Sequence, residues 1–394
     1  MGSDMSGKAL SRVRPVVQES QGSPIRAMKK LMEERSDMVS LAMGEANFSA
    51  PPELIEAAVE AMRQGKNLYT STNGIPAVRE AVSSFAKREW DVDVDPEENV
   101  LMTVGGMEAI HLAFRILVEE GDEVLLPDPG WGMVRTVAER RRARCIYYPL
   151  ARTDTWTYDV DAILERLTDR TKLLAVNSPS NPAGAIMTAE GWRRLTDAAR
   201  AKGVFILSDE VYHNYVYEGE HASVLSHGEL DNLIVINSFS KTFAVTGWRL
   251  GYVIAHPWLI QQMGVYKESI SLCSFSIGQW ALADFLPKSQ GYLAWTRALC
   301  RENMHKMVAV LKDIPGVACP APQGGFYVFL DTSALDPSAQ SMTEYLLREG
   351  IAVVPGNFFG TQGEGCLRLG FAAPWDQLEP GLDRLREALT KKNT

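Results

Sequence analysis

The chain has 394 residues, of which 46% are hydrophobic, and it carries a formal net charge of −9. This length is too great for one ordinary compact core and predicts two domains. The acidic balance, without a basic tail, argues against nucleic-acid binding, and no apolar run is long enough to cross a membrane. We therefore expect a protein that binds neither nucleic acid nor a membrane.

The cysteines and histidines exclude other kinds of chemistry. The five cysteines are Cys145, Cys273, Cys300, Cys319 and Cys366. An odd number without a CxxC pair predicts reduced thiols and, with no signal peptide at the start, a cytoplasmic protein. The six histidines show no metal-ligand spacing, so no metal site is expected.

Short apolar runs from residue 100 onward predict the strands of one sheet. They are Leu101–Val104, Glu123–Leu126, Cys145–Tyr148, Lys172–Val176, Val204–Leu207, Leu233–Asn237 and Leu250–Ile254. Most are continuous rather than alternating, which is typical of strands buried on both faces. Helical segments lie between several of them. Seven strands with helical crossovers predict an α/β fold with a mostly parallel sheet between helices.

The pattern changes near residue 287, where longer helical stretches begin. Strands are expected at Gly324–Leu330 and Ile351–Val354, and a final helix near Leu378–Leu389. These elements predict a smaller α+β domain, and the first forty-odd residues are expected to pack there too. We therefore predict a large domain over residues 48–286 and a small domain formed by residues 1–47 together with 287–394.

One loop after a predicted strand holds a lysine suited to carbonyl chemistry. Lys241 lies between hydroxyl residues in the segment Asn237–Arg249. Ligands of open parallel sheets bind at the carboxyl ends of the strands. A lysine amine in such a pocket has a depressed pKa and acts as a nucleophile toward a carbonyl. Taken alone, the same lysine is also consistent with a surface amine.

Ten short strings extend this pattern over most of the chain. They are, in order, GEANF, YTSTNGIPAVREA, TVGGMEAI, DPGWG, NSPSNPAG, SDEVY, SFSKTFAVTGWRLGY, GGFYVF, VVPGNFFG and LRLGFA. From about Ser23 to Leu389 the chain resembles the class I/II aminotransferases, which are fold type I enzymes of pyridoxal 5′-phosphate, and their aspartate-aminotransferase-like members in particular. The resemblance implies an aminotransferase that moves an amino group between an L-amino acid and a 2-oxo acid, with the cofactor as a Schiff base on Lys241.

The resemblance implies roles for residues around the cofactor ring. Asp209, which ends a strand, is expected to keep the pyridine nitrogen protonated through a charge-assisted hydrogen bond. Asn181 and Tyr212 are expected to hydrogen-bond the phenolic oxygen, and Trp131 to stack on the ring. Lys241, Asp209 and Tyr212 form the predicted catalytic set. Taken singly, Asp209 is also consistent with a turn cap and Trp131 with a core wall.

Six residues are expected at the cofactor phosphate, three at the start of a helix and three from the lysine loop. They are Gly105, Gly106, Met107, Ser238, Ser240 and Arg249. Backbone N–H groups at a helix start bind anions, and Arg249 can bind a phosphate bidentately. A plain turn explains the glycine pair equally well.

Substrate contacts are implied at three positions. Arg368, in the string CLRLG, matches the family arginine that grips the substrate α-carboxylate with its planar fork. Gly44 and Asn181 are expected close to the same carboxylate. An arginine in a purely structural role would instead need a carboxylate partner from the protein.

The resemblance also implies an assembly and leaves the substrate open. Tyr69, in NLYTSTNG, matches a family tyrosine that reaches the phosphate of the neighbouring subunit, which implies a homodimer. The alternative is a core tyrosine of the same subunit. Asn47, Val134 and Ala183 depart from the family pattern. Met107 stands where some aspartate-using relatives have a lysine, so dicarboxylic amino acids are not expected to be the best substrates.

Two other functions remain as alternatives. The same fold and cofactor also serve elimination, replacement and cyclisation reactions of specialised metabolism, because they do not fix the reaction type. A regulator with an aminotransferase-like sensor would need an added DNA-binding domain. Only about forty residues precede GEANF, without a helix-turn-helix pattern or a basic face. An aminotransferase therefore remains the leading hypothesis.

Overall fold

The computed structural model describes residue 12 and residues 37–393 of the protein. Its centre is an eight-stranded sheet with the strand order β2-β9-β8-β7-β6-β3-β4-β5. The strands are β2 (Val100–Thr103), β3 (Glu123–Asp128), β4 (Arg144–Arg152), β5 (Trp156–Tyr158), β6 (Thr171–Asn177), β7 (Phe205–Asp209), β8 (Leu233–Ser238) and β9 (Gly251–Ala255). Six strands run in one direction, whereas β9 and β5 are antiparallel to their neighbours.

All seven predicted strands lie in this sheet, which confirms an α/β fold with a mostly parallel sheet. The predicted number of seven strands was wrong by one, because the sequence analysis missed β5. This strand has three residues and pairs with the end of β4 across a short turn, so no apolar run marks it.

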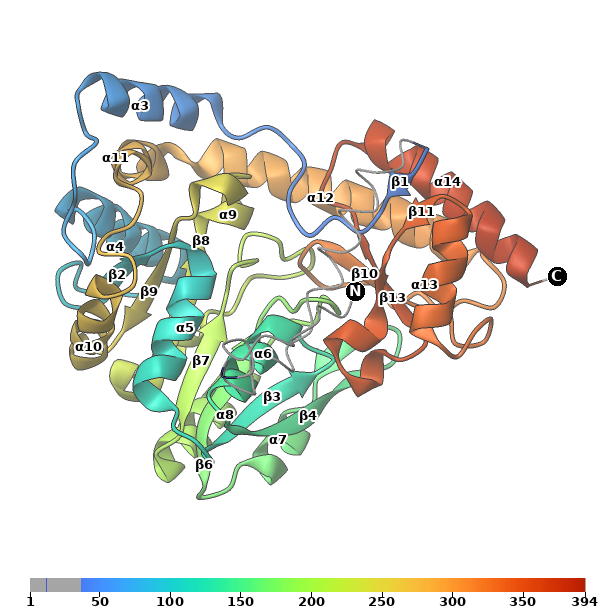
Figure 1. Cartoon of the computed structure of the whole chain (residues 1–394), viewed down its shortest axis with the longest axis horizontal. Coiled ribbons are helices and arrows are strands. Elements are labelled where there is room, and N and C mark those ends of the chain that lie inside the picture. Colours follow the sequence, from blue (N-terminus) through green and yellow to red (C-terminus); the bar gives the residue numbers. More distant parts are fainter. Residues whose placement is uncertain (1–11, 13–36, 394) are drawn as a thin grey trace.

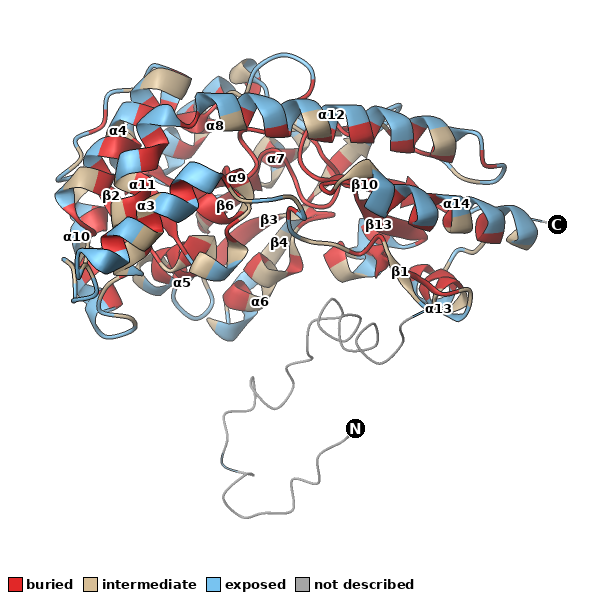
Figure 2. Ribbon diagram, turned by 90° about the horizontal axis from the view of Figure 1, so that it is seen from above, coloured by how far each residue is buried: buried red, intermediate tan, exposed pale blue. Residues whose placement is uncertain are grey.

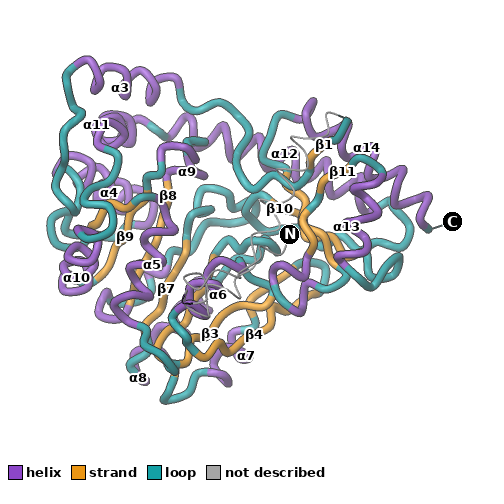
Figure 3. The backbone as a smooth tube through the Cα atoms, in the orientation of Figure 1, coloured by secondary structure: helices purple, strands orange, loops and turns teal. Residues whose placement is uncertain are grey.

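Two apolar cores cover the two faces of the sheet, and Figure 3 shows its strands between the helices. The first core includes α4 (Pro76–Trp90), α8 (Ala189–Lys202) and α11 (Ser276–Phe285), and the second includes α5 (Gly105–Leu117), α6 (Gly132–Arg140) and α10 (Pro257–Glu268). Neighbouring strand residues alternate between the cores, as Leu125 and Val124 do. Burial on both faces therefore explains why the strands are continuous apolar runs.

The C-terminal part of the chain, together with one early strand, builds a second, smaller layer (Figure 1), called the C-terminal layer below. Its elements are the three-stranded sheet β10-β13-β12 (Tyr327–Asp331, Cys366–Gly370, Val354–Pro355), the paired strands β1 (Val39–Ser40) and β11 (Ile351–Ala352), and the helices α12 (Gln290–Lys312), α13 (Ala339–Arg348) and α14 (Trp375–Lys392). In Figure 2 buried and exposed residues alternate along the long helix α12, so one of its faces packs inward and the other faces solvent. These elements share a third apolar core.

The sequence-based boundaries in this part are only approximate. The strand expected at Gly324–Leu330 begins at Tyr327, and the strand expected at Ile351–Val354 is divided between β11 and β12. The two halves belong to different sheets, because β11 pairs with β1 and β12 with β13. The division into domains over 48–286 and over 1–47 with 287–394 stays a prediction, and most of 1–47 lies outside the described residues. Within the described ranges, every helix is too short or too polar to cross a membrane.

A buried ion pair lies at the start of helix α5. Lys267 Nζ in α10 is 2.9 Å from Glu108 Oε2 in α5, and both side chains are almost fully shielded from solvent. Ser271 Oγ accepts a hydrogen bond from Lys267 Nζ and donates one to Glu108. The backbone N–H of Val104 donates to Glu108 Oε2 at 2.7 Å, so the pair also fixes the turn between β2 and α5.

Lys267→Met should destabilise the protein by about 3–5 kcal/mol, because it leaves the Glu108 carboxylate buried without its cation. The double variant Glu108→Gln with Lys267→Met should recover most of this loss. Lys288→Met is the matched control, since its exposed pair with Asp284 is worth at most about 1 kcal/mol. Free energies of unfolding from denaturant titration measure all three. A single Lys267 variant as stable as the unmodified protein would contradict the prediction.

Candidate active site

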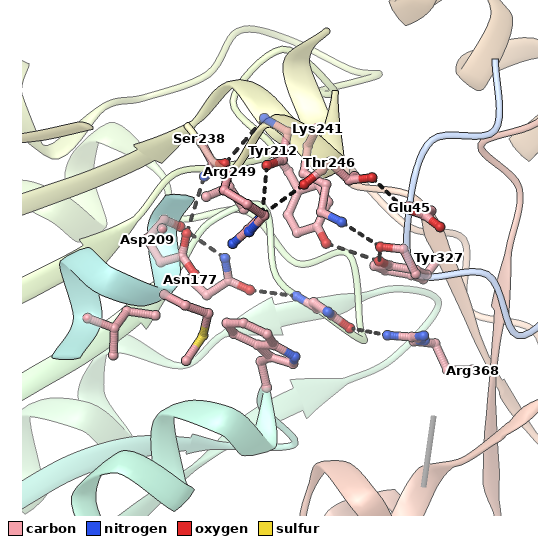
Figure 4. Close-up of a pocket in the computed structure, with 18 residues that line it drawn as sticks. Glu45, Asn177, Asp209, Tyr212, Ser238, Lys241, Thr246, Arg249, Tyr327 and Arg368 are labelled. Carbon is pink, nitrogen blue, oxygen red and sulfur yellow. Dashed lines mark hydrogen bonds between the residues drawn. The ribbon is translucent and has the colours of Figure 1, made fainter. Parts of the chain in front are cut away.

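One cavity of about 380 Å³ lies where the carboxyl ends of the parallel strands meet the C-terminal layer. Eighteen residues line it, and Figure 4 shows how the labelled ones converge. Twelve of them belong to the predicted site: Gly44, Gly106, Met107, Trp131, Asn181, Asp209, Tyr212, Ser238, Ser240, Lys241, Arg249 and Arg368. The structure therefore brings together residues from most of the length of the described chain.

Two predicted site residues are not in the lining. Gly105 lies behind it, against the guanidinium of Arg249. Tyr69 is on the surface of the subunit with 83% of its area exposed, so it is not a core tyrosine.

The sequence analysis missed six lining residues: Glu45, Ile110, Asn177, Val211, Thr246 and Tyr327. All six stand inside the strings that carry the resemblance. The signal was therefore present, but a string does not tell which of its side chains point into a cavity.

Strand β8 and the short helix α9 (Phe239–Thr242) hold Lys241. The Ser238 side chain caps α9 by accepting from the N–H of Ser240 at 3.2 Å. Lys241 Nζ donates to the carbonyl oxygen of Gly44 at 2.6 Å. Burial lowers the pKa of Lys241, so more of its amine is neutral and nucleophilic than in water.

Asp209 ends strand β7 and is buried in the wall of the cavity. Burial raises the pKa of its carboxyl to about 7. A hydrogen bond from the N–H of Val211 acts in the opposite direction and lowers this pKa. A cation beside Asp209 would favour the ionised form. Its neighbour Glu210 points away from the cavity, to Ser208 and His221, as the alternation of an extended strand requires.

Arg368 lies in strand β13 of the C-terminal layer, across the cavity from the carboxyl ends of the parallel strands. Only 1% of its area is exposed. It donates to Asn181 Oδ1 at 3.1 Å and to the carbonyl of Ala42 at 3.3 Å, whereas its Nε has no partner. Among the described residues, no carboxylate forms an ion pair with it. A buried guanidinium that lacks an anion and lines a cavity is suited to binding a carboxylate ligand.

Groups suited to an anion lie at the end of the cavity near helix α5. The helix has no side-chain cap at Val104, and its first N–H groups have no partner within the helix. Gly105 has a φ of +70°, and a Cβ on it would lie 2.5 Å from Arg249 Nη2. Glycine at position 105 is therefore required for the guanidinium of Arg249 to approach this helix start. Arg249 also donates to the carbonyl of Thr246 at 3.0 Å.

These three sets of groups fit pyridoxal 5′-phosphate. The helix start with Arg249 suits its phosphate, the Asp209 carboxylate suits its ring cation, and the Lys241 amine suits its aldehyde. Arg368 remains for the carboxylate of a second molecule.

Comparisons with known proteins agree with this fit. Residues 36–385 match the family described as aminotransferase class I and II. An aspartate aminotransferase of Pyrococcus horikoshii is 34% identical over 371 residues, which are 93% of this chain and 94% of that protein. Aromatic-amino-acid aminotransferase 2 of Thermococcus litoralis is 31% identical over 375 residues, 94% of this chain and 96% of that one. The structure of Thermus thermophilus aspartate aminotransferase with maleate superposes with a TM-score of 0.91, at 32% identity, over 95% of this chain and 99% of that chain.

The chain therefore belongs to the class I and II aminotransferases. It has the type I fold and is a pyridoxal-phosphate-dependent enzyme that transfers an amino group between an amino acid and a 2-oxo acid. The predicted family, fold, cofactor and reaction are confirmed.

Proposed function

We propose that Lys241 both anchors the cofactor covalently and carries the proton during amino transfer. It is the only lysine among the residues that line the cavity, and burial lowers the pKa of its amine. When bound, the cofactor draws electrons away from the bonds of the substrate α-carbon. Once its amine is free, Lys241 Nζ takes the proton from that carbon and later returns one as a general acid.

We assign the remaining ring contacts to residues around Asp209. Its carboxylate, at the end of β7, holds the pyridine nitrogen in its protonated form. Asn181 and Tyr212 donate to the phenolic oxygen, and Trp131 limits the access of water to one face of the ring. The position of all four side chains in one cavity supports this assignment.

We assign Arg368 to the substrate α-carboxylate and the α5 helix start to the phosphate. A bidentate bond from the Arg368 guanidinium fixes the orientation of the amino acid beside Gly44, whose missing side chain leaves the space open. This orientation aligns the α-carbon–hydrogen bond with the Lys241 amine, so proton loss is favoured over loss of the carboxylate. Gly105, Gly106 and Met107 with Ser238, Ser240 and Arg249 hold the phosphate.

After borohydride reduction, mass spectrometry should find the cofactor on the Lys241 peptide. Lys267 is an internal control, because it is fully buried but paired with Glu108 and should stay unmodified. Lys241→Ala should retain part of the cofactor affinity through the phosphate site but lose turnover. Cofactor on any other lysine would overturn the assignment.

A single turnover with one amino acid and no acceptor tests the reaction type. Transfer yields stoichiometric pyridoxamine phosphate and 2-oxo acid. Ammonia or a cyclised product, with the original cofactor spectrum regained, would instead show elimination or cyclisation.

We further propose that the amino donor has a neutral side chain. The three cations of the lining, Lys241, Arg249 and Arg368, already have assigned partners, and Met107 adds only a thioether. Glu45, at the cavity, is an anion that accepts a hydrogen bond from Thr246. A distal carboxylate would therefore lack a cation among the lining residues of this subunit.

The specificity constants for aspartate and glutamate should be lower than those for neutral amino acids. Met107→Lys should raise the constant for aspartate about tenfold or more, because an ion pair in a desolvated site replaces an unpaired carboxylate. Met107→Leu, which adds no charge, is the control and should leave the preference unchanged. Steady-state kinetics with a panel of amino acids give these specificity constants. A wild-type preference for aspartate or glutamate over neutral amino acids would refute the proposal.

We also propose that the enzyme is a homodimer with shared active sites. Leu68 and Tyr69 are 80% and 83% exposed, and Ile270, Leu272 and Phe275 are also exposed. The segment around Tyr69 and the segment around Phe275 are adjacent, because the Gln279 side chain donates to both the Thr70 hydroxyl and the carbonyl of Ser274. Exposed apolar surface of this kind marks a protein interface. Tyr69 would then reach the cofactor phosphate of the partner subunit.

Mixing two inactive variants tests the shared site. Tyr69→Ala should weaken cofactor binding enough to leave the variant inactive at a low cofactor concentration, and Lys241→Ala should abolish turnover. A mixed dimer of the two would contain one site with both native residues, so mixing should restore activity. If Tyr69 acts within its own subunit, no site is native and activity stays absent. Light scattering should give a dimer, and a fully active monomer would refute the proposal.

The proposed location is the cytoplasm. All five cysteines fall within the described residues, and all five are free, which suits a reducing compartment. Separating cell fractions and assaying the enzyme in each tests this location.

A further inference from the structure

Tyr327 joins several groups of the active site although it was given no role above. It begins strand β10, lines the cavity and is 1% exposed. Its hydroxyl lies 3.0 Å from the hydroxyl of Tyr212 and 3.1 Å from the carbonyl oxygen of Gly44. Lys241 Nζ donates to the same carbonyl at 2.6 Å. Figure 4 shows Tyr327 close to Tyr212, Lys241 and Arg368.

The hydroxyl of Tyr327 fixes the position of the Tyr212 hydroxyl. Each tyrosine has one hydroxyl hydrogen, which can go to only one acceptor at a time. The carbonyl of Gly44 accepts from both Lys241 and Tyr327, and Tyr327 remains as its donor once Lys241 anchors the cofactor. The Tyr327 hydroxyl is thereby fixed 3.0 Å from that of Tyr212 and holds it at the cavity, where the proposed acceptor of Tyr212 is the phenolic oxygen of the cofactor.

The ring of Tyr327 supports Arg368. The guanidinium carbon lies 4.2 Å from the centroid of this ring and 5.1 Å from that of Phe359. An aromatic face attracts a guanidinium and fixes its plane, and the N–H groups in that plane stay available for hydrogen bonds. The ring thus sets the orientation in which Arg368 meets a carboxylate.

We propose that Tyr327 is a further positioning residue for amino transfer, which orients Tyr212 through its hydroxyl and Arg368 through its ring. The inference rests on the functions proposed above for Tyr212 and Arg368. Its two parts are separable, because phenylalanine keeps the ring and removes only the hydroxyl.

Tyr327→Phe should lower kcat about threefold to tenfold, the effect of one lost hydrogen bond, and leave KM for the amino acid unchanged. Without the hydroxyl of Tyr327, the Tyr212 hydroxyl loses the contact that fixes it, so its hydrogen bond to the phenolic oxygen of the cofactor changes. The pH midpoint of the absorbance change of the bound cofactor should therefore shift. The other charged groups around this site are the same in both proteins: Glu45, Asp209, Lys241, Arg249 and Arg368.

Tyr327→Leu removes the ring as well and should raise KM about tenfold in addition to the loss in kcat. Tyr217→Phe is the matched control. Tyr217 is also a buried tyrosine, whose hydroxyl bonds the carbonyl of Gly325, but it does not line the cavity. It should keep the wild-type kcat, KM and pH midpoint. Cofactor content of each purified variant shows whether the site is intact.

A phenylalanine variant with wild-type kcat and midpoint would overturn the role of the hydroxyl, and a leucine variant with wild-type KM would overturn that of the ring. Failure of the underlying assignments would look different. In that case the unmodified enzyme would carry its cofactor on a lysine other than Lys241, or Arg368→Lys would leave KM unchanged.

Discussion

The removal of charged groups from water at one edge of the central sheet is the constraint on which the rest of the structure depends. Asp209 and Arg368 are buried and Lys241 is partly buried around one cavity, and none of them has an ion-pair partner among the described residues. Burial raises the pKa of Asp209 and lowers the pKa of Lys241, so it shifts both groups toward their neutral forms. Such an arrangement costs stability unless ligands of matching charge bind there. The two apolar cores and the C-terminal layer supply the rigidity that keeps these groups in place.

The fold was readable from the sequence because burial on both faces leaves a continuous apolar run. Strands such as β6 and β8 have this character over Leu173–Val176 and Leu233–Ile236. The three-residue strand β5 does not, since only its pairing with β4 defines it. The division of the expected strand Ile351–Val354 between two sheets is also a tertiary effect that no local pattern contains.

The lining of the cavity was only partly predictable, for a different reason. Residues with distinctive chemistry, such as Lys241 and Arg368, are identified by matching a motif. Asn177 and Tyr327 stand in equally recognisable strings, but their participation depends on side-chain direction and on contacts between distant segments. The bond between Tyr327 and the carbonyl of Gly44 joins residues 283 positions apart. A linear pattern carries no information about such a contact.

The lining residues come from two kinds of backbone, and this has a consequence for how the enzyme can diversify. Asp209 ends a strand with neighbours on both sides, so any shift of this residue would disturb the whole sheet. Met107, in the first turn of a helix, and Glu45, in a loop, hold their side chains at the cavity without such neighbours. Substitutions at Met107 and Glu45 could therefore change the substrate range without moving the proposed catalytic residues Asp209 and Lys241. For protein engineering, a small library at the side chains of Met107 and Glu45 would test whether selectivity changes there while Asp209 and Lys241 are kept.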